Sequence, residues 1–156
     1  MESWISVLAI EDEEHIRQIV KYNLELDGFK VETAENGAVG LEKLRKMEEK
    51  PSVVLLDRMM PEMNGMEVLT AIRDDYELEK IPVIMLTAKS TIGDIEDAFD
   101  AKADGYITKP FDPEKLGQMV KNKLRDCIDN RKKHWKEEKP KKVDNDGKRN
   151  PENLVI

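Results

Sequence analysis

Residues 53–65 read VVLLDRMMPEMNG, four apolar residues that end in a carboxylate and lead into a loop containing proline and glycine. Such a short run of β-branched and aliphatic residues is typical of a strand buried on both faces, as in a parallel sheet. Reactive groups in open α/β sheets collect beyond the carboxyl ends of the strands. Because aspartate is rarely buried without a partner, packing explains Asp57 poorly. Asp57 is therefore a candidate nucleophile or metal ligand.

Apolar runs alternate with helical periods on both sides of this stretch. Strands are predicted at residues 5–10, 29–34, 53–57, 82–87 and 106–108. Apolar residues three or four apart predict helices between and after them. Gly28 is expected to follow the first helix as its C′ residue, and Asn36 to cap the second. Five such units predict an α/β fold, a doubly wound parallel sheet with helices on both faces.

The composition suits one domain of ordinary size with an appendage. Of 156 residues, 39% are hydrophobic and 38% are charged. No apolar stretch approaches the ~20 residues of a membrane-spanning helix, and residues 1–4 (MESW) do not resemble a signal peptide. Cys127 is the single cysteine, which excludes an intramolecular disulfide and fits a reducing compartment. We therefore expect a cytoplasmic protein that makes no contact with membranes.

The net charge of -7 is unevenly distributed along the chain. Residues 126–156 hold nine Lys and Arg against seven Asp and Glu, whereas residues 1–125 hold 17 against 26. An acidic body is a poor general nucleic-acid binder, so any attraction for an anion resides in the tail. We expect residues 1–128 to form the domain, and residues 129–156 to form a charged extension, partly helical and then disordered.

The predicted strand ends bring polar residues to one edge of the sheet. These residues are Glu11, Asp12 and Glu13 after the first strand, Asp57 after the third, Thr87 at the end of the fourth and Lys109 after the fifth. If the first and third strands are neighbours, their carboxylates converge, and two charges ~4 Å apart repel by roughly 4 kcal/mol at an effective dielectric of 20. Magnesium, a hard cation with a preference for oxygen, fits such a cluster. The alternative is that Glu11 and Glu13 are merely solvated at a helix N-terminus.

A carboxylate beside Mg²⁺, a lysine and a hydroxyl is what phosphoryl transfer to aspartate requires. Asp57 would attack and form an acyl phosphate. The metal would take one phosphoryl oxygen, Lys109 a second as a point charge, and Thr87 with a loop N–H the third. We therefore predict Asp57, Thr87 and Lys109 as the catalytic residues.

Four stretches together resemble the receiver domain of two-component response regulators, of the chemotaxis single-domain type. They are residues 10–13 (IEDE), 55–65 (LLDRMMPEMNG), 85–88 (MLTA) and 105–111 (GYITKPF). The resemblance implies a flavodoxin-like five-stranded parallel sheet with strand order 2-1-3-4-5. It also implies that Asp57 accepts a phosphoryl group from a sensor histidine kinase or a phosphotransfer protein.

The resemblance also implies further roles. Mg²⁺ would be held by Glu11, Asp12, Asp57 and the main-chain carbonyl of Met59. Thr87 and Tyr106 would form a switch pair, in which the hydroxyl moves to the phosphoryl group and the ring turns inward; plain packing is the alternative for Tyr106. The output would be a protein partner or a phosphorylation-dependent homodimer, through the face of the fourth helix, fifth strand and fifth helix. Such a protein is a signalling phosphoacceptor, not an enzyme, and catalyses only its own phosphoryl transfer and dephosphorylation.

The sequence departs from the family pattern in three respects. Arg58 stands where an aliphatic residue is common, and we expect a solvated surface arginine or a ligand for phosphate or an acidic partner. Lys102 stands where glycine commonly ends the fourth helix; because a left-handed lysine costs about 1 kcal/mol, we expect this helix to end differently. Met59 and Lys89 fill the positions that tune dephosphorylation. Neither orients a water, which predicts a long-lived phosphoryl group.

About 30 residues follow the domain, too few for a DNA-binding output domain with its own core. The leading interpretation is a stand-alone receiver that acts by phosphorylation-dependent protein contact or relays the group onward. The alternative is a receiver whose basic C-terminal tail contacts nucleic acid, although the lysines of that tail are mixed with acids. A pseudo-receiver that keeps the fold without the chemistry is a third interpretation, and the complete set of site residues argues against it.

Overall fold

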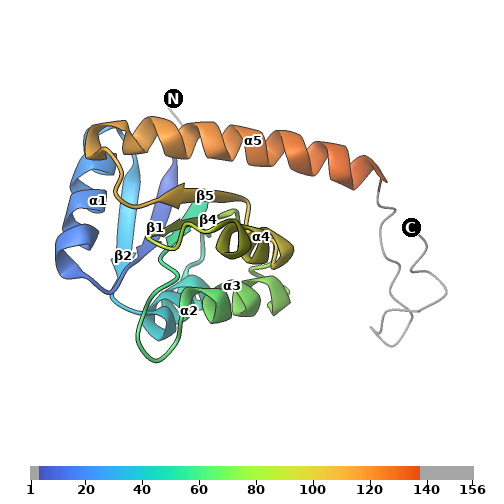
Figure 1. Ribbon diagram of the computed structural model, residues 1–156, viewed down its shortest axis with the longest axis horizontal. Helices are drawn as coiled ribbons and strands as arrows, with labels where there is room; N and C mark the ends of the chain where they lie inside the picture. Colours follow the sequence, from blue (N-terminus) through green and yellow to red (C-terminus); the bar gives the residue numbers. More distant parts are fainter. Residues whose placement is uncertain (1–3, 138–156) are drawn as a thin grey trace. The chain divides into compact units, whose positions relative to one another are not determined.

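The computed structural model describes residues 4–137 (Figure 1). Its strands form one parallel sheet in the order β2-β1-β3-β4-β5. They are β1 (Ser6–Ile10), β2 (Lys30–Ala34), β3 (Val53–Leu56), β4 (Val83–Thr87) and β5 (Gly105–Thr108). The predicted flavodoxin-like sheet and its strand order are confirmed.

Helices alternate with these strands as the sequence predicts. They are α1 (Glu14–Leu26), α2 (Gly37–Lys46), α3 (Gly65–Asp74), α4 (Ile92–Asp100) and α5 (Leu116–Glu137), the last preceded by a 3₁₀ turn at Pro113–Lys115. Asn36 caps α2 by accepting a hydrogen bond from the N–H of Val39. Gly28 follows α1 with φ 87°, a left-handed conformation that glycine adopts without steric cost. Both predicted signals are confirmed.

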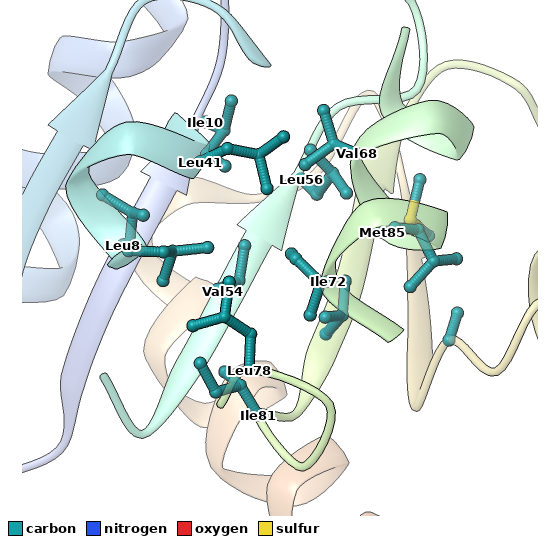
Figure 2. Close-up of a cluster of buried hydrophobic side chains, with 14 of the residues drawn as sticks. Leu8, Ile10, Leu41, Val54, Leu56, Val68, Ile72, Leu78, Ile81 and Met85 are labelled. Carbon is teal, nitrogen blue, oxygen red and sulfur yellow. The ribbon is translucent and has the colours of Figure 1, made fainter. Parts of the chain in front are cut away.

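Two hydrophobic clusters cover the two faces of the sheet. Because side chains alternate along a strand, Leu8 and Ile10 of β1 join one cluster, whereas Val7 and Ala9 join the other. Figure 2 shows the first cluster, in which β3 packs against α3. The second cluster includes α1 and the first turns of α5. All four residues of β3 are buried, so the polar group nearest this strand is Asp57, directly after its carboxyl end.

The end of α4 differs from the prediction, because Lys102 does adopt the left-handed conformation, with φ 71°. Its N–H donates to the carbonyl of Phe99 at 2.9 Å, and the N–H of Ala103 donates to the carbonyl of Ala98 at 2.9 Å. These two bonds form a Schellman closure, the usual end of a helix at a left-handed residue. The expectation that α4 ends differently was therefore wrong.

A partly buried arginine explains why lysine is accepted at this turn. Arg73 Nε donates to the carbonyl of Lys102 at 2.9 Å, and Arg73 Nη2 lies 2.7 Å from Asp104 Oδ2. The same Asp104 oxygen accepts the N–H of Val83 at 2.9 Å. Charge-assisted hydrogen bonds of this kind are worth about 1.5–3 kcal/mol each, more than the left-handed backbone costs.

The chain comprises two compact units, Met1–Leu124 and Arg125–Ile156, and α5 crosses their boundary. The sheet belongs to the first unit. In the second, α5 continues to Glu137 and Cys127 is buried. The expected domain bounds, 1–128 and 129–156, stay predictions, and the disorder expected in the extension concerns residues 138–156, which lie outside the described residues. Between residues 4 and 137, no helix combines the length and apolarity needed to cross a bilayer.

Candidate functional site

Three carboxylates meet at the carboxyl edge of the sheet. Ile10 and Leu56 are paired in register, so the residues that follow them leave β1 and β3 side by side. Oxygens of Glu11, Asp12 and Asp57 all lie within 4.8 Å of one another. Glu11 is 3% exposed and Asp57 4%. Two of the three charges are thus removed from water and require compensation.

Lys109 supplies a positive charge to this cluster. Its Nζ lies 2.8 Å from Glu11 Oε2 and 3.2 Å from Asp57 Oδ2. The lysine follows β5, and its N–H donates to the carbonyl of Thr87 at 2.9 Å. The Lys109–Pro110 peptide bond is cis. One ammonium facing three carboxylates leaves the cluster negative.

Burial and the neighbouring charges shift two pKa values in the site. Burial raises the pKa of Glu11 to about 7, and the charge of Asp57 adds to this, while the hydrogen bond from Lys109 opposes it. Burial lowers the pKa of the Lys109 ammonium, but the hydrogen bond to Glu11 and the charge of Asp57 outweigh it and raise the pKa overall. Lys109 is therefore charged at neutral pH, whereas Glu11 holds a proton more tightly than an exposed glutamate.

The two residues expected to form a switch pair both contact Lys89. Thr87 is fully buried at the end of β4, and its Oγ1 accepts the N–H of Lys89 at 3.4 Å. Tyr106 of β5 is 8% exposed, and its hydroxyl donates to the carbonyl of Lys89. Burial raises the pKa of the Tyr106 phenol. Both side chains are therefore linked to the loop that leads from β4 to α4.

The loop after β3 is folded tightly around Asp57. The N–H of Met59 donates to Asp57 Oδ1 at 3.1 Å, while the Met59 side chain is exposed. The N–H of Gly65 donates to the carbonyl of Arg58 at 2.9 Å. A Cβ at position 65 would lie 2.2 Å from the Asp57 carbonyl oxygen. Only glycine allows α3 to begin so close to this loop.

The donor set of the cluster fits a hard divalent cation. Three carboxylate oxygens from Glu11, Asp12 and Asp57 lie close enough to share one ion, and magnesium prefers oxygen ligands of this type. Asp12 is half-buried, so the ion would keep access to water, which magnesium usually retains.

Arg58 is held inside the protein, contrary to the expected solvated arginine. Its side chain is 17% exposed, and Nη1 donates to the main-chain carbonyl of Asp94 at 2.8 Å. The partner lies 36 residues away in α4, so no local pattern in the sequence pointed to it. The interpretation as a ligand for phosphate or an acidic partner stays a prediction.

Arg17 is a site residue that the sequence argument did not single out. Its Nη1 donates to the main-chain carbonyls of Glu11 at 2.9 Å and Asp12 at 3.1 Å. It thereby fixes the turn that carries two of the three carboxylates. A basic residue in the first helix, close to an acidic turn, was the available signal.

An apolar groove opens beside the cluster. Its lining includes Ile16 and Ile19 of α1 together with Ala88, Pro110 and Phe111, and Lys109 forms part of its wall. The groove therefore shares Lys109 with the acidic cluster.

A family model and curated relatives match most of this chain. The model of the response regulator receiver domain matches residues 7–121. The transcriptional regulatory protein SrrA of Staphylococcus aureus is 40% identical over 119 residues, which are 76% of this chain and 47% of SrrA. This chain thus spans about half the length of the curated relatives that it matches.

Two solved structures extend the comparison. The chemotaxis response regulator CheY4 of Vibrio cholerae is 32% identical, with a TM-score of 0.72, over 78% of this chain and 99% of that chain. A CheY-like receiver domain protein from Methanospirillum hungatei JF-1 is 29% identical, with a TM-score of 0.71, over 82% and 99% of the two chains.

Proposed function

This chain belongs to the response regulator receiver domain family, and we propose that its Asp57 accepts a phosphoryl group from a phosphohistidine of a sensor histidine kinase or phosphotransfer protein. The observation that carries the proposal is the contact of Lys109 Nζ with Asp57 Oδ2 at 3.2 Å inside a cluster of three carboxylates. The buried carboxylate can act as the nucleophile. The ammonium beside it can neutralise the negative charge that develops on the phosphoryl oxygens.

The proposed reaction needs few protein groups. An Asp57 oxygen attacks phosphorus, the bond between phosphorus and the donor imidazole nitrogen breaks, and an acyl phosphate forms on Asp57. Lys109 neutralises one phosphoryl oxygen as a point charge, and the Thr87 hydroxyl donates to another. The protein contributes position and charge, which dominate catalysis of phosphoryl transfer. It acts as a signalling phosphoacceptor and catalyses only its own phosphorylation and dephosphorylation.

We assign Mg²⁺ to the acidic cluster. Its proposed ligands are the carboxylates of Glu11, Asp12 and Asp57 and the main-chain carbonyl of Met59. When bound, the ion supplies positive charge to the phosphoryl oxygens during transfer. Arg17 supports this assignment, because its two hydrogen bonds hold the turn at Glu11 and Asp12 in one conformation.

The donor protein docks on the apolar groove next to Lys109 in this proposal. Its lining by Ile16, Ile19 and Phe111, next to Lys109, suits an apolar partner surface around a reactive histidine. With Met59 and Lys89 at the positions that tune dephosphorylation, the phosphoryl group is long-lived.

The proposed output is a change of a protein-binding surface on α4, β5 and α5. Thr87 and Tyr106 both contact Lys89, which precedes α4, so a phosphoryl group that binds the Thr87 hydroxyl alters the loop that leads to α4. On α4, Ile92 and Phe99 are 77% and 46% exposed. Exposed apolar side chains of this kind suit a protein partner or a second copy of the chain. The stand-alone interpretation stays a prediction, because SrrA has about twice the matched length. A cytoplasmic location also stays a prediction.

Incubation with Mg²⁺ and acetyl phosphate tests the function without a partner. We expect intact-mass spectrometry to detect the mass gain of one phosphoryl group. Asp57→Asn should abolish it and EDTA should prevent it. Asp74→Asn, at an exposed position on α3, is the matched control and should retain it. A mass gain that survives in Asp57→Asn, or wild type that is never modified, would overturn the proposal.

A further inference from the structure

Arg58 connects the segment of the phosphoacceptor to helix α4. It is the residue next to Asp57, yet its guanidinium binds α4 at three points. Nη1 donates to the Asp94 carbonyl at 2.8 Å and lies 3.8 Å from Asp94 Oδ1, and Nη2 lies 3.8 Å from Asp97 Oδ2. Arg58 and Asp94 are 17% and 19% exposed, so their contact is screened less by water than a surface ion pair, whereas Asp97 is 66% exposed.

The contacts fall on the N-terminal half of α4. Thr91 caps this helix and forms a capping box with Asp94, so Asp94 belongs to the first turn. A cation near a helix N-terminus is disfavoured by the helix dipole. The guanidinium is kept there by the two carboxylates and the carbonyl, which makes its position sensitive to any competing negative charge.

Arg58 also influences Tyr106 of strand β5. Burial raises the pKa of the Tyr106 phenol, whereas the nearby positive charge of Arg58 lowers it. Arg58 therefore lies within reach of the side chain whose hydroxyl donates to Lys89. A single side chain thus links the loop after β3, helix α4 and strand β5.

Resting on the proposed phosphorylation of Asp57, we propose that Arg58 is a positioning residue that holds α4 before phosphorylation and releases it afterwards. A phosphoryl group brings about two negative charges to the residue next to Arg58. These charges compete with Asp94 and Asp97 for the guanidinium. A two-state change requires a contact that differs between the two states. Here the guanidinium would contact α4 before phosphorylation and the phosphoryl group afterwards. An aliphatic side chain at position 58 could not provide such a contact.

Hydrogen exchange of the α4 amides, with and without acetyl phosphate and Mg²⁺, tests this role. In wild type, phosphorylation should raise exchange of residues 96–101 about tenfold, the effect expected for loss of one charge-assisted hydrogen bond. In Arg58→Met, the unphosphorylated protein should already exchange at the faster rate and should change little on phosphorylation. Arg58→Lys, which keeps the charge, should restore part of the difference.

Two controls separate coupling from general destabilisation. Arg45→Met removes an ion pair with Asp75 at 3.4 Å on an arginine that is 55% exposed, and should leave α4 exchange as in wild type. Exchange in α2 should stay constant in Arg58→Met, because a merely destabilised fold would speed exchange in every helix.

The outcomes distinguish this inference from the proposed function. If wild type and Arg58→Met are both phosphorylated but respond equally in α4, or if wild-type α4 does not respond, the role of Arg58 is refuted and the function stands. If intact mass shows that wild type is never phosphorylated, the function fails and this inference fails with it.

Discussion

Lys109 Nζ lies 2.8 Å from Glu11 Oε2, although the strands that these residues follow, β5 and β1, are separated in the sheet by β3 and β4. The lysine side chain therefore reaches across the carboxyl edge of two intervening strands. The same ammonium also contacts Asp57, which follows β3. The stability of the metal-free protein consequently depends on how one ammonium balances two buried carboxylates.

Because of Glu11, the free energy of unfolding should fall as pH rises toward neutrality. Its pKa is about 7 in the folded protein, above its ordinary value of 4.5. Between these values the folded protein keeps a proton that the unfolded chain has released, so stability is lost as pH rises through the folded pKa. At about 1.4 kcal/mol per pKa unit, the loss is roughly 3–4 kcal/mol. Urea unfolding in EDTA at several pH values should show this slope in wild type. A Glu11→Gln variant with the same slope would disprove the assignment.

Lys109→Met should destabilise the metal-free protein and prevent phosphorylation. Removing one partner of a buried ion pair typically costs about 3–5 kcal/mol. Because Glu11 can take up a proton, we expect about 1–3 kcal/mol here. Urea unfolding in EDTA measures the first effect, and intact mass after acetyl phosphate measures the second. Lys21→Met removes an exposed ion pair with Glu25 and should change neither quantity.

Gly65→Ala should disturb the site through the backbone. The new Cβ would lie 2.2 Å from the Asp57 carbonyl oxygen and 2.6 Å from Arg58 Cα, so α3 or the loop must shift. We expect a loss of about 1–3 kcal/mol in unfolding free energy and slower phosphorylation by acetyl phosphate. Gly93→Ala is the matched control, because its Cβ would meet nothing closer than 3.9 Å. Equal effects of the two substitutions would contradict the explanation.

Thr87→Ala should permit phosphorylation but uncouple it from α4. The hydroxyl is worth about 1.5–3 kcal/mol when it binds a charged group, whereas inverting a 1:99 equilibrium takes about 5.5 kcal/mol. Loss of this contact would therefore leave Lys109 alone to shift the population. Intact mass should record the modification, and exchange of the α4 amides should respond less than in wild type. A full α4 response in this variant would show that Thr87 is not part of the switch.

Lys102→Gly should stabilise the protein. A left-handed residue with a side chain costs about 1–2 kcal/mol, of which the greater freedom of unfolded glycine cancels about half. Thermal or urea unfolding should detect a gain of about 0.5–1 kcal/mol. Lys102→Ala serves as the control, because alanine bears the same left-handed cost; a similar gain there would rule out backbone strain as the cause.

Elements that follow from local pattern and topology could be predicted from the sequence. The run at residues 53–56 became β3, and Asn36 and Gly28 became the cap of α2 and the left-handed residue after α1. Glu11, Asp12 and Asp57 converge because neighbouring parallel strands end at the same edge. Spacing along the chain contains this information.

The main-chain carbonyl partners of three arginines could not be predicted from the sequence. Arg58 and Arg73 donate to main-chain carbonyls 36 and 29 residues away in the chain. Neither periodicity nor propensity carries a signal for a side chain that binds the backbone of another element. The same contact from Arg73 overrode the local preference at Lys102, which is why the predicted end of α4 was wrong. Arg17 was closer, but its role depends on the turn conformation at Glu11 and Asp12.

The burial of Cys127 has a practical consequence for spectroscopy. It is the one thiol in the sequence and is shielded from solvent, and buried cysteines react slowly with alkylating reagents. A Glu96→Cys variant, at an exposed position on α4, would therefore take up a maleimide dye selectively without removal of the native thiol. The movement of this helix could then be followed by fluorescence in real time as acetyl phosphate is added.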